Sequence, residues 1–212
     1  MRTRLCLVRH GETDWNVERR LQGHLDVSLN ARGRAQALAT ARALKGHEFD
    51  AVYSSDLARA NETARAVAAA SGLPIHTAAS LRERHYGDFQ GLTYNEAAER
   101  HPQAYARFMA RDTGFDIPGG GESLDTFSKR IGKALLAIAD QHPGRQILIV
   151  THGGVLDIAH RLATNTPLMA ERDFAIPNAA LNWIVRRDED WHLEAWAQQG
   201  HLGVALDELQ NT

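Results

Sequence analysis

The sequence has a single cysteine, Cys6, among its 212 residues, so an intramolecular disulfide is excluded. Cys6 lies inside the apolar run at residues 5–8, which favours a small buried side chain and a reducing compartment. No apolar stretch approaches the roughly 20 residues that cross a bilayer, and the one after residue 4 is too short for a signal peptide. We therefore expect a cytoplasmic protein with no membrane contact.

Neither sign of charge predominates, because 24 lysine and arginine residues face 26 aspartate and glutamate residues and the formal net charge is -2 at pH 7. This balance argues against a nucleic-acid partner bound through a broad basic face. Lysine is rare, at positions 45, 129 and 133 only, so arginine carries nearly all the positive charge. Arginine suits planar, two-pronged contacts to phosphate or carboxylate, and any anion site must be built locally.

Two apolar runs each end in a His-Gly pair. Residues 5–8 continue into Arg9, His10 and Gly11, and residues 147–150 continue through Thr151 into His152. A short apolar run closed by glycine is typical of a strand in a parallel sheet, and such sheets bind ligands at the carboxyl ends of their strands. The sequence therefore predicts that both histidines share one cleft.

Strand and helix patterns alternate along the chain. This order predicts an α/β fold: a single-domain three-layer α/β/α sandwich over residues 1–212, with a mostly parallel central sheet and a capping insertion at about 81–121. Asn30 and Ser123 are the expected N-caps of two helices, and the stretch 15–29 is expected to be a loop. Predicted strands are 5–8, 51–54, 75–77, 147–150, 182–187 and 191–196, and predicted helices are 31–44, 57–70, 94–100, 102–111, 124–141 and 154–162.

Several motifs, in this order, resemble the histidine phosphatase superfamily in its phosphoglycerate mutase-like branch. They are LVRHGET at 7–13 with Trp15 and Asn16, LQGHLD at 21–26, SSDLARA at 54–60, LRERHYG at 81–87, GES at 121–123 and VTHG at 150–153. The resemblance covers most of the chain. It implies a phosphatase that needs no metal or other cofactor and acts on a small phosphorylated metabolite.

The resemblance also implies roles for individual residues. His10 would be the nucleophile that carries the phosphoryl group, and Glu83 would be the general acid. Arg9, Arg59 and His152 would bind the phosphoryl oxygens, because this reaction depends on positioned cations and donors. The expected substrate contacts are Asn16, Gln22, Gly23, Tyr86 and Gly153.

The leading interpretation is a phosphatase that hydrolyses small phosphomonoesters, and the alternative is a phosphoglycerate mutase. The run from Glu83 to Gly87 resembles the mutase version of that motif. Against the mutase, the stretch 108–122 is short, and Arg107 and Arg111 do not reproduce the paired-arginine clamp of true mutases. A silent phospho-ligand binding module would lack the nucleophile or the acid, and both are present. The identity of the metabolite and a homodimeric state are left open.

Overall fold

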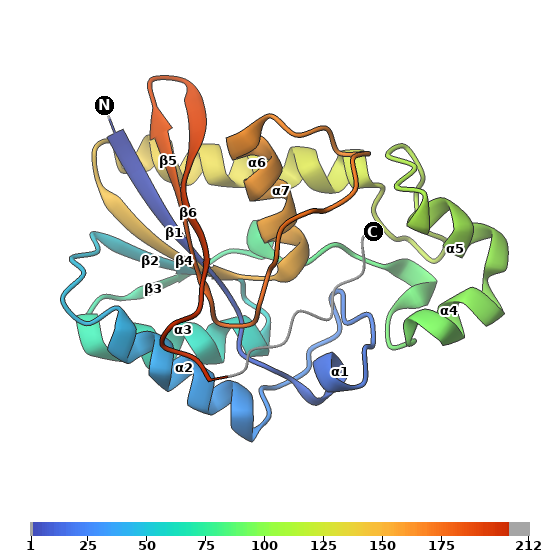
Figure 1. Ribbon diagram of the computed structural model, residues 1–212, viewed down its shortest axis with the longest axis horizontal. Helices are drawn as coiled ribbons and strands as arrows, with labels where there is room; N and C mark the ends of the chain where they lie inside the picture. Colours follow the sequence, from blue (N-terminus) through green and yellow to red (C-terminus); the bar gives the residue numbers. More distant parts are fainter. Residues whose placement is uncertain (1, 204–212) are drawn as a thin grey trace.

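The computed structural model describes residues 2–203 and contains a six-stranded sheet with strand order β3-β2-β4-β1-β5-β6 (Figure 1). Strands β3, β2, β4 and β1 run parallel, and β5 and β6 pair antiparallel at one edge. The prediction of a mostly parallel sheet is therefore confirmed. The strands are β1 (Arg2–Arg9), β2 (Ala51–Ser54), β3 (Ile75–Thr77), β4 (Gln146–Thr151), β5 (Leu181–Arg187) and β6 (Asp190–Gln198).

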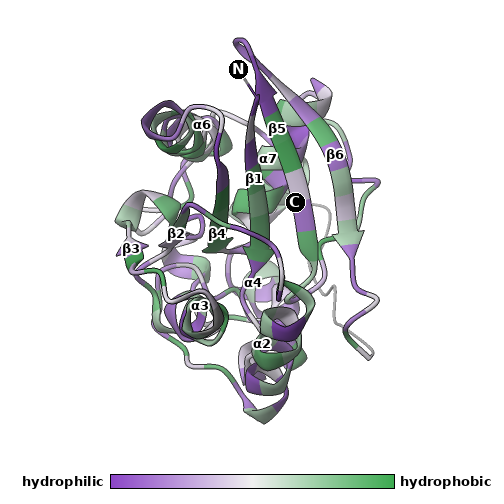
Figure 2. Cartoon of the chain, turned by 90° about the vertical axis from the view of Figure 1, so that its left-hand side faces the viewer, coloured by the Kyte–Doolittle hydropathy of each residue, from purple (hydrophilic) through white to green (hydrophobic). Residues whose placement is uncertain are grey.

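Helices cover both faces of the sheet, because the central strands alternate apolar side chains between two cores. Leu5 and Leu7 of β1 belong to the core under α6 (Leu124–Gln141) and α7 (Gly153–Thr164), and Cys6 and Val8 to the core that α2 (Ala31–Ala43) and α3 (Ala58–Ser71) cover. In Figure 2 the part of β1 inside the sheet is green, whereas green and purple alternate along the edge strand β6. Strands buried on both faces appear in sequence as continuous apolar runs.

The expected helix caps are present. The Asn30 side chain accepts a hydrogen bond from the backbone of Gly33, and that of Ser123 accepts one from Thr126. The stretch 15–29 differs from the expected loop, because its start belongs to a short helix, α1 (Asp14–Val17). Thr13 and Asn16 form a reciprocal capping box there, which satisfies backbone donors that a single turn would otherwise expose.

The segment between β3 and α6 builds a separate small hydrophobic cluster. It contains η1 (Ala79–Leu81), η2 (Gly87–Phe89), α4 (Tyr94–Arg100) and α5 (Pro102–Met109), and Figure 1 shows α4 and α5 beyond the end of the sheet. Phe108 packs edge-on against Tyr86 and Phe89, with ring centroids 5.9 and 5.6 Å apart. Leu21, from the chain after α1, joins this cluster. No helix within residues 2–203 is long and apolar enough to cross a bilayer.

Candidate active site

The two predicted histidines meet where β1 and β4 end. Arg9 pairs with Thr151 in the parallel register, and the next backbone N–H, of His10, donates to the Thr151 carbonyl at 2.9 Å. The His10 and His152 rings lie edge to face with centroids 5.3 Å apart. The structure therefore brings the two histidines together, because their strands are parallel neighbours, and His10 lines the pocket at this point whereas His152 is fully buried beside it.

The His10 ring is fixed in one tautomer. Its Nδ1 lies 2.7 Å from the carbonyl oxygen of Gly11, which can only accept, so Nδ1 carries the proton and Nε2 keeps its lone pair. Burial, reinforced by the charges of Arg59 and Arg9, holds the pKa of His10 well below its usual 6.5. His10 is thus neutral near pH 7, with a free nitrogen lone pair.

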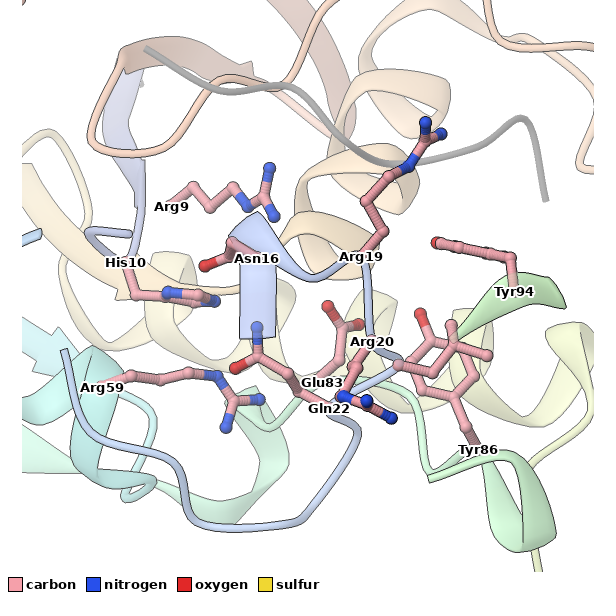
Figure 3. Close-up of a pocket in the computed structure, with 11 residues that line it drawn as sticks. Arg9, His10, Asn16, Arg19, Arg20, Gln22, Arg59, Glu83, Tyr86 and Tyr94 are labelled. Atoms are coloured by element: carbon pink, nitrogen blue, oxygen red, sulfur yellow. The ribbon is translucent and has the colours of Figure 1, made fainter. Parts of the chain in front are cut away.

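Two buried guanidinium groups flank His10 (Figure 3). Arg9 donates from Nη1 to the carbonyl of Ile176 at 2.9 Å, and Arg59 donates to the carbonyls of Leu25 and Gly23 at 2.9 and 2.8 Å. Burial lowers the pKa of Arg59 to about 10, so the group remains cationic near neutrality. Main-chain acceptors therefore orient both cations.

Arg59 lies in the first turn of α3, as the sequence predicted. Backbone N–H groups at a helix start can also bind an anion, but here the N–H of Ala58 already donates to the Asp26 carboxylate at 2.7 Å. The arginine side chain is the part of this helix start that faces the pocket.

His152 is fully buried, and neither of its ring nitrogens has a hydrogen-bond partner among residues 2–203. Burial first, and then the charge of Arg59, hold its pKa well below 6.5. A buried polar group without a partner costs free energy unless a ligand or water satisfies it. The His152 ring is therefore suited to donate one N–H to an anion that lies beside His10.

Glu83 is almost fully buried, and both of its carboxyl oxygens accept backbone hydrogen bonds. Oε1 accepts from Arg84 at 2.8 Å, and Oε2 accepts from Gly154 at 3.0 Å. Burial raises the pKa of Glu83 above 4.5, against these hydrogen bonds and the charges of Arg59 and Arg9. A dianionic ligand would raise it further, so this carboxyl group is suited to hold a proton.

Two of the expected substrate contacts, Asn16 and Gln22, are both hydrogen-bonded to one hydroxyl group, that of Thr13, in the segment after β1. Thr13 Oγ1 accepts from Gln22 Nε2 at 2.9 Å and donates to Asn16 Oδ1 at 3.0 Å. Gln22 Oε1 is buried without a partner among the described residues and lies on the pocket wall. Gly23 has a left-handed φ of +52° and presents its carbonyl to Arg59. Gly153 begins α7 directly after His152.

The pocket wall includes Tyr86 and four residues that the sequence analysis did not single out, namely Arg19, Arg20, Leu21 and Tyr94 (Figure 3). Arg20 pairs with Glu18 and Glu96 at 2.6 and 2.8 Å. Arg19 forms no ion pair within residues 2–203. Arg19 and Arg20 form a basic pair between Asn16 and Gln22, so the sequence could have predicted them as pocket residues, whereas no neighbouring motif indicated Tyr94.

Arg107 and Arg111 do not line this pocket. Arg107 pairs with Asp112 at 2.5 Å, and Arg111 is buried against Asp157 at 3.0 Å. The sequence-based view that they do not form a substrate clamp agrees with these contacts. Among residues 2–203, no three side chains of His, Cys, Asp or Glu are grouped as metal ligands would be.

Comparison with known proteins gives the same picture over nearly the whole chain. Residues 5–199 match the model of the histidine phosphatase superfamily, branch 1. "Phosphoglycerate mutase-like protein 4" of Arabidopsis thaliana is 47% identical over 93% of this chain and 86% of its own. The "metal-independent phosphoserine phosphatase" of the same plant is 41% identical over 94% and 83%.

A solved structure agrees as well. Bacillus stearothermophilus YhfR superposes with a TM-score of 0.87 at 34% identity, covering 95% of this chain and 100% of its own. The fold, the two histidines at the strand ends and these similarities lead to one conclusion. The chain belongs to the histidine phosphatase superfamily, branch 1.

Proposed function

We propose that this protein is a phosphatase that hydrolyses small phosphomonoesters through a phosphohistidine on His10. The observation that carries the proposal is the state of the His10 ring: Nδ1–H is bound to the Gly11 carbonyl, so the Nε2 lone pair is available between two buried guanidinium groups. Neutral imidazole is both a competent nucleophile and a good leaving group near pH 7.

In the first step His10 Nε2 attacks phosphorus, and the bond from phosphorus to the ester oxygen breaks. Arg9 and Arg59 bind the equatorial oxygens, and His152 donates one N–H to them. Glu83 gives its proton to the departing oxygen, so the alcohol leaves neutral. The products of this step are the alcohol, the Glu83 carboxylate and phosphohistidine.

In the second step the Glu83 carboxylate takes a proton from water, and the water oxygen attacks phosphorus. The bond from phosphorus to Nε2 breaks, the ring recovers its lone pair, and inorganic phosphate leaves. Glu83 thus acts as acid and then as base, which returns the enzyme to its starting state. Arg9, Arg59 and His152 bind the same oxygens throughout.

Among phosphomonoesters, we propose that those with a carboxylate on the alcohol part, such as phosphoserine and 3-phosphoglycerate, are preferred. A phosphate dianion balances Arg9 and Arg59, and Arg20 is already paired, so Arg19 is the positive charge of the wall that remains for a second anion. The similarity to a phosphoserine phosphatase supports this choice. Asn16, Gln22, Gly23, Tyr86 and Gly153 complete the proposed substrate site.

Phosphoglycerate mutase is the second candidate, because relatives with mutase-like names are similar over most of the chain. A mutase must keep the released phosphoglycerate in the pocket until the phosphoryl group returns to it. Arg107, in the last turn of α5, and Arg111, just after α5, are engaged by Asp112 and Asp157 and do not line the pocket. This arrangement favours transfer to water.

The test compares wild-type protein with His10→Ala on phosphoserine, 3-phosphoglycerate, α-ribazole phosphate and a sugar phosphate. Released phosphate and isomerised phosphoglycerate are measured in parallel. We expect phosphate release that His10→Ala abolishes, with the carboxylate-bearing esters hydrolysed fastest. Isomerisation with little phosphate release would support the mutase, and turnover by His10→Ala would overturn the phosphohistidine mechanism.

We further propose that the whole chain, residues 1–212, is one domain and that residues 81–121 cap its pocket. The hydrophobic cluster of that segment, which includes the wall residues Tyr86 and Tyr94, supports the capping role. We also propose a cytoplasmic location, which the single buried thiol of Cys6 favours.

A further inference from the structure

One side chain outside the pocket, that of Arg130, donates hydrogen bonds to several backbone carbonyls next to and at Glu83. Arg130, on α6, donates from Nη1 to the carbonyls of Ser80 and Arg82 and from Nη2 to the carbonyl of Glu83, at 3.0, 2.9 and 3.0 Å. Its Nε and Nη2 also donate to the Glu122 carboxylate at 2.8 and 2.7 Å. All five N–H donors of the guanidinium group therefore have acceptors.

This binding matters because regular secondary structure does not place Glu83. The helix η1 ends at Leu81 and η2 begins at Gly87, so residues 82–86 lie outside helices and strands. Glu83 is held there by its carbonyl, which accepts from Arg130 and from His24 Nε2 at 2.8 Å. Side-chain donors thus determine where the backbone of Glu83 lies.

Glu122 completes the arrangement from the other side. Its carboxylate accepts both hydrogen bonds from Arg130 and a third from the backbone N–H of His85 at 2.9 Å, and its own carbonyl accepts from Arg84 Nε. Burial raises the pKa of Glu122, but the hydrogen bonds from Arg130 and His85 outweigh burial, and the net pKa is lowered. Glu122 therefore stays charged while Glu83 favours its proton, as two carboxyl groups with different roles require.

Helix α6 also supports the far end of Glu83. The Arg130 guanidinium lies 5.0 Å from the ring centre of Phe127, and that ring lies beside Gly154, whose N–H binds Glu83 Oε2. Residues of α6 therefore support both the backbone and the carboxyl group of Glu83. A shift of Arg130 would change the distance between this carboxyl group and the ester oxygen.

We propose that Arg130 and Glu122 are positioning residues, which hold Glu83 where its carboxyl group protonates the leaving oxygen. This inference rests on the proposed function. It assigns neither residue a contact with substrate, since both act through Glu83. Poor positioning of a general acid slows only those reactions in which the leaving group needs the proton.

The experiment compares phosphoenzyme formation by wild type and Arg130→Met on two esters in single-turnover rapid-quench assays. Phosphoserine releases an alkoxide that needs a proton, and p-nitrophenyl phosphate releases a stable phenolate that does not. We expect transfer from phosphoserine to slow by about 10- to 100-fold and transfer from p-nitrophenyl phosphate to change by less than about threefold. In a Glu83→Gln background, Arg130→Met should add no further loss with phosphoserine.

The matched control is Arg145→Met, which removes an exposed arginine paired with Asp50 at 3.1 Å and should leave both rates unchanged. If Arg130→Met does not fold, as thermal unfolding would show, Glu122→Gln tests the same ratio with less change of shape. Equal losses on both esters, or full additivity with Glu83→Gln, would overturn the positioning role. Turnover by His10→Ala would instead overturn the proposed function.

Discussion

Replacement of Gly154 by alanine should separate activity from stability. A Cβ at this position would lie 2.2 Å from Glu83 Oε1 and 3.2 Å from Phe127 Cε1. Because ordinary contacts lie near 3.5 Å, the carboxyl oxygen must move by about 1 Å. It can do so by rotation of the Glu83 side chain, which would lengthen the hydrogen bonds that the carboxyl group accepts from Arg84 and from residue 154. A misplacement of about 1 Å costs on the order of 100-fold in rate, so we expect kcat with phosphoserine to fall by about that factor.

The same substitution should hardly change the free energy of unfolding. Alanine is favoured over glycine by up to about 1 kcal/mol in a helix, and residue 154 is the second residue of α7. The weakened hydrogen bond from residue 154 to Glu83 costs about 1 kcal/mol, so the two effects nearly cancel. For a chain of this length the Tm should then stay within about 3 °C of wild type.

The assay measures kcat with phosphoserine and with p-nitrophenyl phosphate, beside Tm by differential scanning calorimetry. The matched control is Gly132→Ala on α6, where the nearest atom to the new Cβ is Leu162 Cδ1 at 4.0 Å. This control should raise the unfolding free energy by about 0.5–1 kcal/mol and leave kcat unchanged. A Gly154→Ala variant with wild-type kcat on phosphoserine, or with a Tm lower by more than about 10 °C, would refute the reasoning.

Three other outcomes are expected. Activity requires neutral His10 and protonated Glu83, and both should show in the pH profile of kcat/KM. The pKa of His10 is lowered, so activity should be lost on acidification only below pH 6.5, and it should fall as pH rises through the raised pKa of Glu83. Glu83→Gln should remove this fall at high pH. Asp157→Asn removes the carboxylate that pairs with the buried guanidinium groups of Arg111 and Arg161, so urea unfolding should show a loss of about 3–5 kcal/mol, and a loss below about 1 kcal/mol would contradict the buried pair. Burial raises the pKa of the Cys6 thiol far above 9.0, so native protein should resist thiol reagents at pH 8 that label the urea-unfolded chain; rapid labelling of native protein would contradict this.

Local pattern was sufficient for much of the fold. Continuous apolar runs at residues 5–8 and 147–150 predicted buried parallel strands, and Asn30 and Ser123 marked two helix starts, because capping depends on neighbours three residues away. The short helix α1 was missed because its capping box uses Asn16 in the place where glutamate or glutamine is usual. Its four residues, Asp14 to Val17, are also too few to show helical periodicity.

The sequence was enough to predict the residues proposed to react, since the His-Gly pairs, Arg59 and Glu83 stand in recognisable motifs. The two histidines lie together because β1 and β4 are parallel neighbours that end at the same edge of the sheet, and this proximity could be predicted from strand direction alone. Only the tertiary structure decided their chemical state. The His10 tautomer, the lowered pKa of both histidines and the raised pKa of Glu83 depend on burial and on charges from distant segments.

The same holds for residues that no motif marked. Arg130 meets the carbonyls around Glu83 from 47 positions or more along the chain, and Tyr94 reaches the pocket wall from a separate hydrophobic cluster. Their placement depends on how α6 and α4 pack, which is a cooperative property of the folded core. Sequence spacing encodes neighbours along one helix or strand, whereas contacts between elements exist only after the entropy of the whole chain has been lost on folding.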